Sequence, residues 1–127
     1  YLEKNNISPA FIDLQSCYII NNEYIVITDH FCPLANNSIT ISTIYSKHNP
    51  FISPELTSIS SLPSTIPKQS CYYSVARIIL KLMFFPHTSL PDSVPDELNY
   101  IYASKLYWLL FWCFDTNPKN RFLLIII

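Results

Sequence analysis

The chain contains no glycine among its 127 residues, although average usage of roughly 7% predicts about nine. Glycine supplies the positive φ angles of tight turns and the close backbone approach of phosphate-binding loops. The sequence therefore excludes a glycine-rich phosphate loop of any kind. Asparagine tolerates positive φ, so we expect it to form the tight turns.

The composition predicts a folded domain with a core. Half of the residues are hydrophobic, 13% are charged, and the formal net charge is -1. This balance excludes a disordered tail and provides no basic surface for nucleic acid. The most membrane-like run, residues 106–114, is much shorter than the roughly 20 residues of a spanning helix, so we expect no membrane span. Because the chain opens on Tyr1 and ends within "RFLLIII", we expect only part of a domain.

The cysteines are widely spaced and include no C-x-x-C pair. This pattern favours buried free thiols in a reducing compartment over disulfides, and we therefore predict an intracellular, cytoplasmic location. The four cysteines are Cys17, Cys32, Cys71 and Cys113.

The pattern along the chain predicts a mainly α fold with one small β-hairpin. Residues 17–28 contain two β-prone runs joined by "NNE", which indicates a hairpin. Residues 29–56 are rich in Pro, Ser, Thr and Asn and are expected to form a long irregular loop. A central buried helix is predicted over 70–85, with Ser70 as its N-cap, and helices are predicted over 96–127.

Three short motifs in this order resemble motifs of the C-terminal lobe of the eukaryotic protein kinase fold. "SPEL" at 53–56 is similar to the A-P-E motif, "YYSVARIIL" at 72–80 to the W-S-L-G-V-I-L helix, and "DTNPKNR" at 115–121 to the D-P-x-x-R stretch. The resemblance implies a kinase-like C-lobe, of α+β class, without its N-lobe. It also implies a buried ion pair between Glu55 and Arg121, and structural roles for Pro54, Tyr73 and Ser74.

The same resemblance implies that the catalytic groups are missing. In the gapless register, the H-R-D motif falls on Pro9, Ala10 and Phe11, and Asp29 takes the place of the metal-binding aspartate. A turn or cap role for Asp29 is favoured over Mg²⁺ binding, because one carboxylate without a partner is a poor Mg²⁺ site. A rival register makes Asp13 the catalytic carboxylate, against the simpler interpretation of a solvated loop acid.

These observations lead to three hypotheses about function. The first is a catalytically inactive, pseudokinase-like fragment that acts as a protein-interaction or scaffold module, with no cofactor and with a protein or the missing N-lobe as its partner. The second is a divergent Ser/Thr kinase that uses Asp13, Asp29 and Mg-ATP when joined to its N-lobe. The third is an unrelated helical domain.

Two further patterns leave alternatives open. His30 and Cys32 could form half of a zinc site that His48 and His87 complete, but the spacing matches no standard pattern, and we expect no metal. The segment 38–46, "SITISTIYS", is either a set of phosphorylation sites or an exposed β-prone strand, and the sequence does not decide between them.

Overall fold

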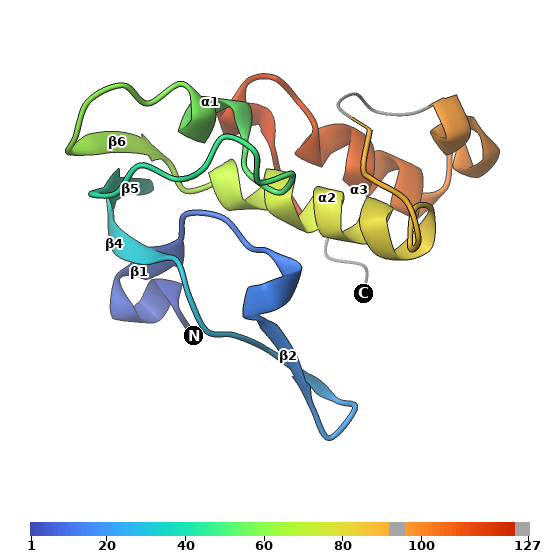
Figure 1. The fold of residues 1–127 in the computed structure, drawn as a ribbon, viewed down its shortest axis with the longest axis horizontal. Helices are drawn as coiled ribbons and strands as arrows, with labels where there is room; N and C mark the ends of the chain where they lie inside the picture. Colours follow the sequence, from blue (N-terminus) through green and yellow to red (C-terminus); the bar gives the residue numbers. More distant parts are fainter. Residues whose placement is uncertain (92–95, 124–127) are drawn as a thin grey trace.

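The structure, a computed structural model, describes residues 1–91 and 96–123 (Figure 1). Within these ranges the first half of the chain is rich in β-structure and the second half is helical. The strands are β1 (Ile7–Pro9), β2 (Cys17–Ile20), β3 (Tyr24–Ile27), β4 (Phe31–Ala35), β5 (Ser38–Ile41) and β6 (Ser64–Pro67). The α-helices are α1 (Pro54–Thr57), α2 (Ser70–Met83) and α3 (Lys105–Cys113), and the 3-10 helices are η1 (Glu3–Asn5), η2 (Leu14–Ser16), η3 (Asp96–Ile101) and η4 (Pro118–Asn120).

Four strands form an antiparallel sheet in the order β1-β4-β5-β6. Residues on β5 alternate between the two faces, so Ile39 and Ile41 point into a core where both are 0% exposed. Ile39 also lies opposite Ile66 of β6, which is buried as well. This core lies between the sheet and the segment that leads into α1, and it includes Phe11, Ile52 and Leu56.

The remaining two strands, β2 and β3, form a separate hairpin that extends away from the sheet and the helices (Figure 1). Cys17 lies opposite Ile27, and Ile20 opposite Tyr24. The turn contains Asn21 and Asn22, whose φ angles are 54° and 55°. Two successive left-handed residues match the twist of a tight hairpin, and asparagine adopts this conformation at less cost than other residues with a Cβ.

Asparagine takes the place of glycine throughout the described chain. Five of the seven positive-φ residues are asparagines, and they include Asn36 and Asn37 in the turn between β4 and β5. The seven are Asn6, Asn21, Asn22, His30, Asn36, Asn37 and Ala103.

A second core lies where α2 packs against α3 and η3. Ala76 and Leu80 of α2 meet Leu110 and Cys113 of α3, and each of the four is 0% exposed. The helix predicted over 70–85 is therefore present as Ser70–Met83, but the predicted N-cap is wrong. Ser70 is its first helical residue, and the N-cap position is occupied by Gln69 without a side-chain hydrogen bond.

The prediction of a mainly α fold is wrong. Residues 29–56 were expected to be an irregular loop, yet they contain β4 and β5, which lie at the centre of the larger sheet. Pro33 does not break β4, because its neighbour Leu34 donates to the carbonyl oxygen of Asn6 at 2.8 Å, so the nitrogen of Pro33 points away from β1, and on that side β5 pairs only with Leu34 and Ala35. Its missing N–H therefore faces no neighbouring strand.

The resemblance to a protein kinase C-terminal lobe is contradicted by the same finding. Such a lobe is mainly helical, whereas the described chain carries six strands in two antiparallel sheets before α2. The expectations that depended on it, a C-lobe lacking its N-lobe and a pseudokinase or kinase function, lose their basis with the fold.

The C-terminal part is less helical than the sequence predicted. Within 96–127, α3 is the only α-helix among the described residues, and η3 and η4 are short 3-10 segments. Residues 124–127, which the predicted helices included, lie outside the described range. The described helices include none with the length and apolar character that crossing a membrane requires.

Candidate functional site

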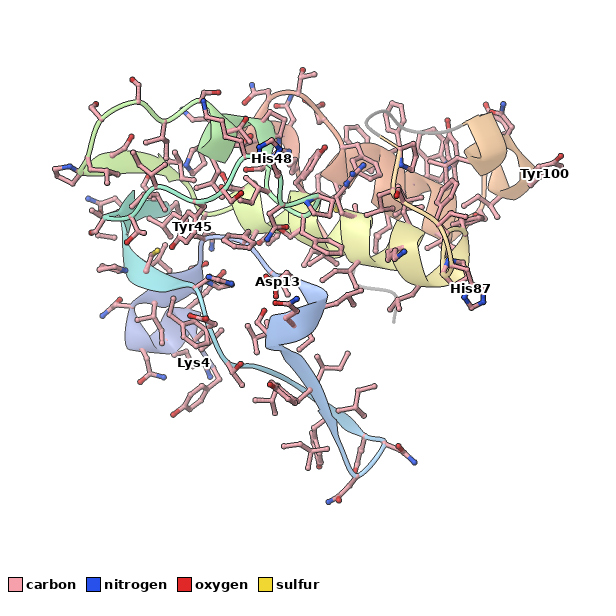
Figure 2. The ribbon with its side chains drawn as sticks, viewed as in Figure 1. Lys4, Asp13, Tyr45, His48, His87 and Tyr100 are labelled. Atoms are coloured by element: carbon pink, nitrogen blue, oxygen red, sulfur yellow. The ribbon has the colours of Figure 1, made fainter. Side chains whose placement is uncertain are left out.

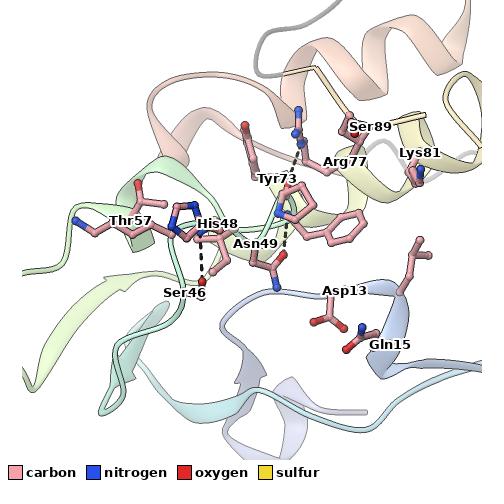
Figure 3. Close-up of a pocket in the computed structure, with 16 residues that line it drawn as sticks. Asp13, Gln15, Ser46, His48, Asn49, Thr57, Tyr73, Arg77, Lys81 and Ser89 are labelled. Carbon is pink, nitrogen blue, oxygen red and sulfur yellow. Dashed lines mark hydrogen bonds between the residues drawn. The ribbon is translucent and has the colours of Figure 1, made fainter. Parts of the chain in front are cut away.

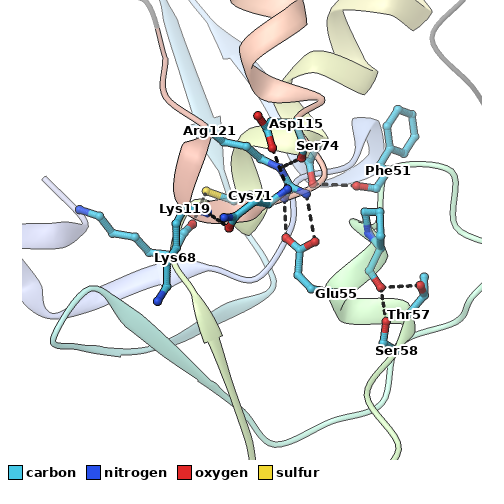
Figure 4. Close-up of polar contacts among 12 residues, drawn as sticks. Phe51, Glu55, Thr57, Ser58, Lys68, Cys71, Ser74, Asp115, Lys119 and Arg121 are labelled. Atoms are coloured by element: carbon cyan, nitrogen blue, oxygen red, sulfur yellow. Dashed lines mark hydrogen bonds and ion pairs between the residues drawn. The ribbon is translucent and has the colours of Figure 1, made fainter.

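The structure brings Glu55 and Arg121 together, although 66 positions separate them (Figure 4). The guanidinium donates from Nη1 to Oε1 at 2.5 Å and from Nη2 to Oε2 at 3.1 Å, which is a bidentate ion pair. Nε of Arg121 donates to the carbonyl oxygen of Asp115 at 2.8 Å. Arg121 is 2% exposed, so this pair links α1 to the C-terminal segment inside the molecule.

The other residues of the motifs surround this ion pair. Pro54 and Glu55 open α1, with the proline in the first turn where no N–H is needed. The ring of Tyr73 lies 5.3 Å from the guanidinium carbon of Arg121, a cation–π contact. Ser74 donates a 2.7 Å hydrogen bond to the carbonyl oxygen of Phe51, which attaches α2 to the segment before α1.

The environment of Glu55 keeps it ionised. Burial alone would raise the pKa of this carboxyl, but the hydrogen bonds and the charge of Arg121 outweigh burial, and its pKa lies below the usual value. A bidentate pair between a buried guanidinium and a half-buried carboxylate holds the two segments together, and both carboxylate oxygens are already engaged. We therefore assign it a structural role.

The two candidate catalytic carboxylates, Asp13 and Asp29, lie near the two ring nitrogens of one histidine, His30. Nε2 of His30 lies 3.4 Å from Oδ2 of Asp13, and Nδ1 lies 3.9 Å from Oδ1 of Asp29. The imidazole stacks on the ring of Phe11, with centroids 4.0 Å apart. The sequence patterns point to His30 as half of a zinc site and do not indicate its position between the two acids.

Asp13 and Asp29 both have local structural roles. Asp13 caps η2, since its Oδ1 accepts the N–H of Ser16 at 2.9 Å and the Ser16 side chain completes a capping box. Burial would raise the pKa of Asp13, but the hydrogen bonds from Ser16 and the charge of His30 lower it. Asp29 is exposed and accepts the N–H of His30 at 2.6 Å, as a turn residue does.

No activated nucleophile accompanies His30 in the described structure. Burial raises the pKa of Tyr45 to about 12 and also raises that of the Cys32 thiol, so both neighbours stay protonated at neutral pH. The Cys32 thiol instead donates to the carbonyl oxygen of His30 at 3.8 Å. The cluster can fix the turn between β3 and β4, but it does not form a nucleophile–base pair.

The proposed zinc ligands do not come together. Figure 2 shows His48 beside the loop before α1 and His87 at the far end of α2. Among the described residues, no group of three or more His, Cys, Asp or Glu side chains is placed to hold a metal ion.

The hairpin β2–β3 is the most unusual surface of the described molecule. Both of its faces are apolar and open to solvent, and Glu23, in the turn, is the only charged residue of the segment 17–27. Large apolar side chains line both strands: Tyr18 (56% exposed), Ile19 (71%), Ile20 (48%), Tyr24 (59%), Ile25 (74%) and Val26 (36%). The sequence revealed the hairpin but gave no indication that it stands outside the core.

The segment 38–46 divides into two parts. Residues 38–41 form β5 in the middle of the larger sheet, so the expectation of an exposed strand is wrong for them. Ser42, Thr43 and Ile44 are exposed in the following loop. The structure does not test phosphorylation of this segment.

Comparison with known proteins adds no assignment, since no protein-family model and no curated protein matches the sequence.

Proposed function

We propose that this chain acts as a protein-interaction module and that the hairpin β2–β3 is its contact element. The observation that carries the proposal is the exposure of six large apolar side chains on a hairpin that lies apart from both cores. Contiguous exposed apolar patches are uncommon on monomeric proteins and mark interaction sites. A two-stranded hairpin is also only marginally stable in water, so a partner would stabilise it.

The hairpin suits a protein partner better than a membrane. Its turn is polar, with Asn21, Asn22 and Glu23 at the end that would have to enter a bilayer first. The apolar residues lie along both strands instead, where a groove or a strand of another protein can cover them. Tyrosines such as Tyr18 and Tyr24 are also enriched at protein interfaces, because they bury a large area and keep a polar group.

Site-specific photocrosslinking tests the proposal. A photoreactive amino acid is placed at Ile25 of the hairpin and, in a matched variant, at Leu62, which is 40% exposed before β6. We expect a discrete crosslinked protein from the cell extract with the Ile25 probe and not with the Leu62 probe. Equal crosslinking at both positions, or none at Ile25, would contradict the proposal.

The captured protein is then purified, and its affinity for this chain is compared with its affinity for hairpin variants of the chain. The double substitution Ile19→Thr/Ile25→Thr keeps β propensity but removes the apolar contact of a directly opposed pair. We expect Kd to rise by roughly 30-fold or more, since well-buried interface residues contribute about 2 kcal/mol or more. The control Leu62→Thr should leave Kd unchanged.

We further propose that the module works in a reducing, intracellular compartment. All four cysteines are free in the structure, and three of them are buried. Burial raises the pKa of Cys71 to about 12 and that of Cys113 to about 11, so these thiols resist oxidation. The protein is purified from its natural source and denatured, and a thiol titration should then find four free thiols. A disulfide would contradict this location.

A further inference from the structure

A second surface, separate from the hairpin, is a cleft between η2, the segment 46–52 and α2 (Figure 3). Its volume is about 960 Å³, at the upper end of the range of ligand-binding sites. Asp13 and Gln15 lie on one side, and Arg77 and Lys81 of α2 lie on the other. Phe51 and Leu90 contribute apolar surface to the lining.

The charge of the lining differs from that of the chain as a whole. The sequence has eight Lys and Arg against nine Asp and Glu, but among the side chains that the structure describes the cleft is lined by Lys47, Arg77 and Lys81 and by one carboxylate, Asp13. That carboxylate already accepts the N–H of Ser16 and lies beside His30. The cleft therefore attracts negative charge.

The α2 wall concentrates this effect. Arg77 and Lys81 are four residues apart and line the same cleft, and like charges at this spacing repel each other. Arg77 is 4% exposed and donates to the carbonyl oxygens of Pro50 at 2.7 Å and Pro91 at 2.6 Å. The Nζ of Lys81 donates to the carbonyl oxygen of Thr88 at 2.6 Å.

These carbonyl oxygens orient the two side chains and carry no formal charge. Among the side chains that the structure describes, no carboxylate lies within salt-bridge distance of Arg77 or Lys81. An anion bound in the cleft beside Lys81 would offset this repulsion, with the buried charge of Arg77 behind the cleft wall adding to the attraction.

The arrangement of the charges indicates an extended ligand. Figure 3 shows Arg77 and Lys81 spaced along α2 and His48 at the other end of the cleft, so the polar groups do not surround one point as a single phosphate would require. Gln15 and Asn49 also line the cleft and offer amide groups that can pair with a peptide backbone. We propose that this cleft binds an extended acidic peptide segment, with its carboxylates toward α2.

Fluorescence polarisation with a labelled hexapeptide of alternating Glu and Ala tests the inference on the full chain. We expect saturable binding that weakens as salt is raised, and no binding of the matched peptide of alternating Gln and Ala. Lys81→Gln should weaken binding about fivefold, the effect of one accessible charge pair. Lys119→Gln, which removes an exposed lysine outside the cleft, should not change it.

Three results would overturn the inference. The first is equal binding of the Glu and Gln peptides, and the second is equal weakening by Lys81→Gln and Lys119→Gln, which would mean attraction to charge in general. The third is displacement of the Glu peptide by inorganic phosphate at equal concentration, which would indicate a phosphate site. Thermal melts of both variants show whether they remain folded, and Arg77→Lys provides a second cleft variant if Lys81→Gln does not fold.

Discussion

The two sheets of this protein use similar residues for opposite purposes. In the four-stranded sheet, β5 alternates, so that Ile39 and Ile41 are buried while Ser38 and Thr40 lie on the other face. In the hairpin β2–β3, isoleucine, valine and tyrosine occupy both faces and nearly all are exposed. A strand whose apolar and polar side chains alternate packs one face on a core and leaves the other to solvent. The hairpin strands are apolar on both faces, so a second surface is needed to cover them.

The edges of the two sheets differ in the same way. The edge strands of the larger sheet, β1 and β6, each end on a proline, Pro9 and Pro67, which cannot donate to a further strand. Neither strand of the hairpin contains a proline or a charged residue. The larger sheet is thus protected against added strands, and the hairpin has no such protection, which supports its role as a contact element.

The largest loss of stability should follow from breaking the ion pair between Glu55 and Arg121, which joins α1 to the C-terminal segment. Arg121→Met leaves the half-buried Glu55 without its partner, and we expect the free energy of unfolding to fall by about 3 kcal/mol, the lower end of the range for a buried pair. Denaturant unfolding measures this loss. Lys119→Met, at an exposed position of η4, which ends directly before Arg121, is the control and should cost little. A similar loss of unfolding free energy in both variants would mean that the ion pair itself does not stabilise the fold.

A direct comparison of the sheets comes from one isoleucine in each. Ile41 is 0% exposed and Ile25 is 74% exposed, so the same change to alanine removes a core contact in one case and surface area in the other. We expect Ile41→Ala to cost about 3 kcal/mol and Ile25→Ala less than about 0.5 kcal/mol of unfolding free energy. Equal losses would show that the hairpin is part of the folding core and would weaken the proposed function.

A smaller effect should appear on acidification. Because Arg121 lowers the pKa of Glu55 in the folded state, its contribution to stability is present above the unfolded-state pKa and is lost as the pH falls through the folded-state pKa. We expect the unfolding free energy to decline below about pH 4.5 and to decline less steeply in Glu55→Gln. Urea unfolding from pH 6 to pH 2.5 measures both slopes, and parallel slopes would contradict the assignment.

Local signals in the sequence predicted the elements that depend on neighbouring residues. The hairpin followed from β-prone runs around Asn21 and Asn22, and α2 followed from an apolar run that ends before Pro86. The same asparagine signal at Asn36 and Asn37 would have indicated the turn between β4 and β5. The surrounding prolines outweigh this signal, because they favour an irregular loop when read from the sequence alone.

Features that join distant segments could not be predicted in this way. The pairing of β1 with β4 and of β5 with β6 is set by the tertiary fold, and it decides that Pro33 is tolerated inside a sheet. Glu55 and Arg121 were singled out through motifs whose wider implication, a mainly helical lobe, is wrong. The position of His30 between Asp13 and Asp29 depends on its left-handed φ of 64°, a conformation that histidine tolerates better than most residues but that its residue type alone does not predict.

The smallest expected effect concerns the turn of the hairpin. Asn22 has a φ of 55°, and Asn22→Ala places an unfavourable left-handed alanine there at a cost of about 1 kcal/mol, which Asn22→Gly should not incur. Because the hairpin lies outside both cores, this cost should appear as faster amide hydrogen exchange in Ile19 and Ile25, with little change in the midpoint of global unfolding. If Asn22→Ala instead lowers global stability as much as Ile41→Ala does, the hairpin and the larger sheet unfold as one unit. The hairpin would then belong to the folding core of the four-stranded sheet and would not be a separate contact element.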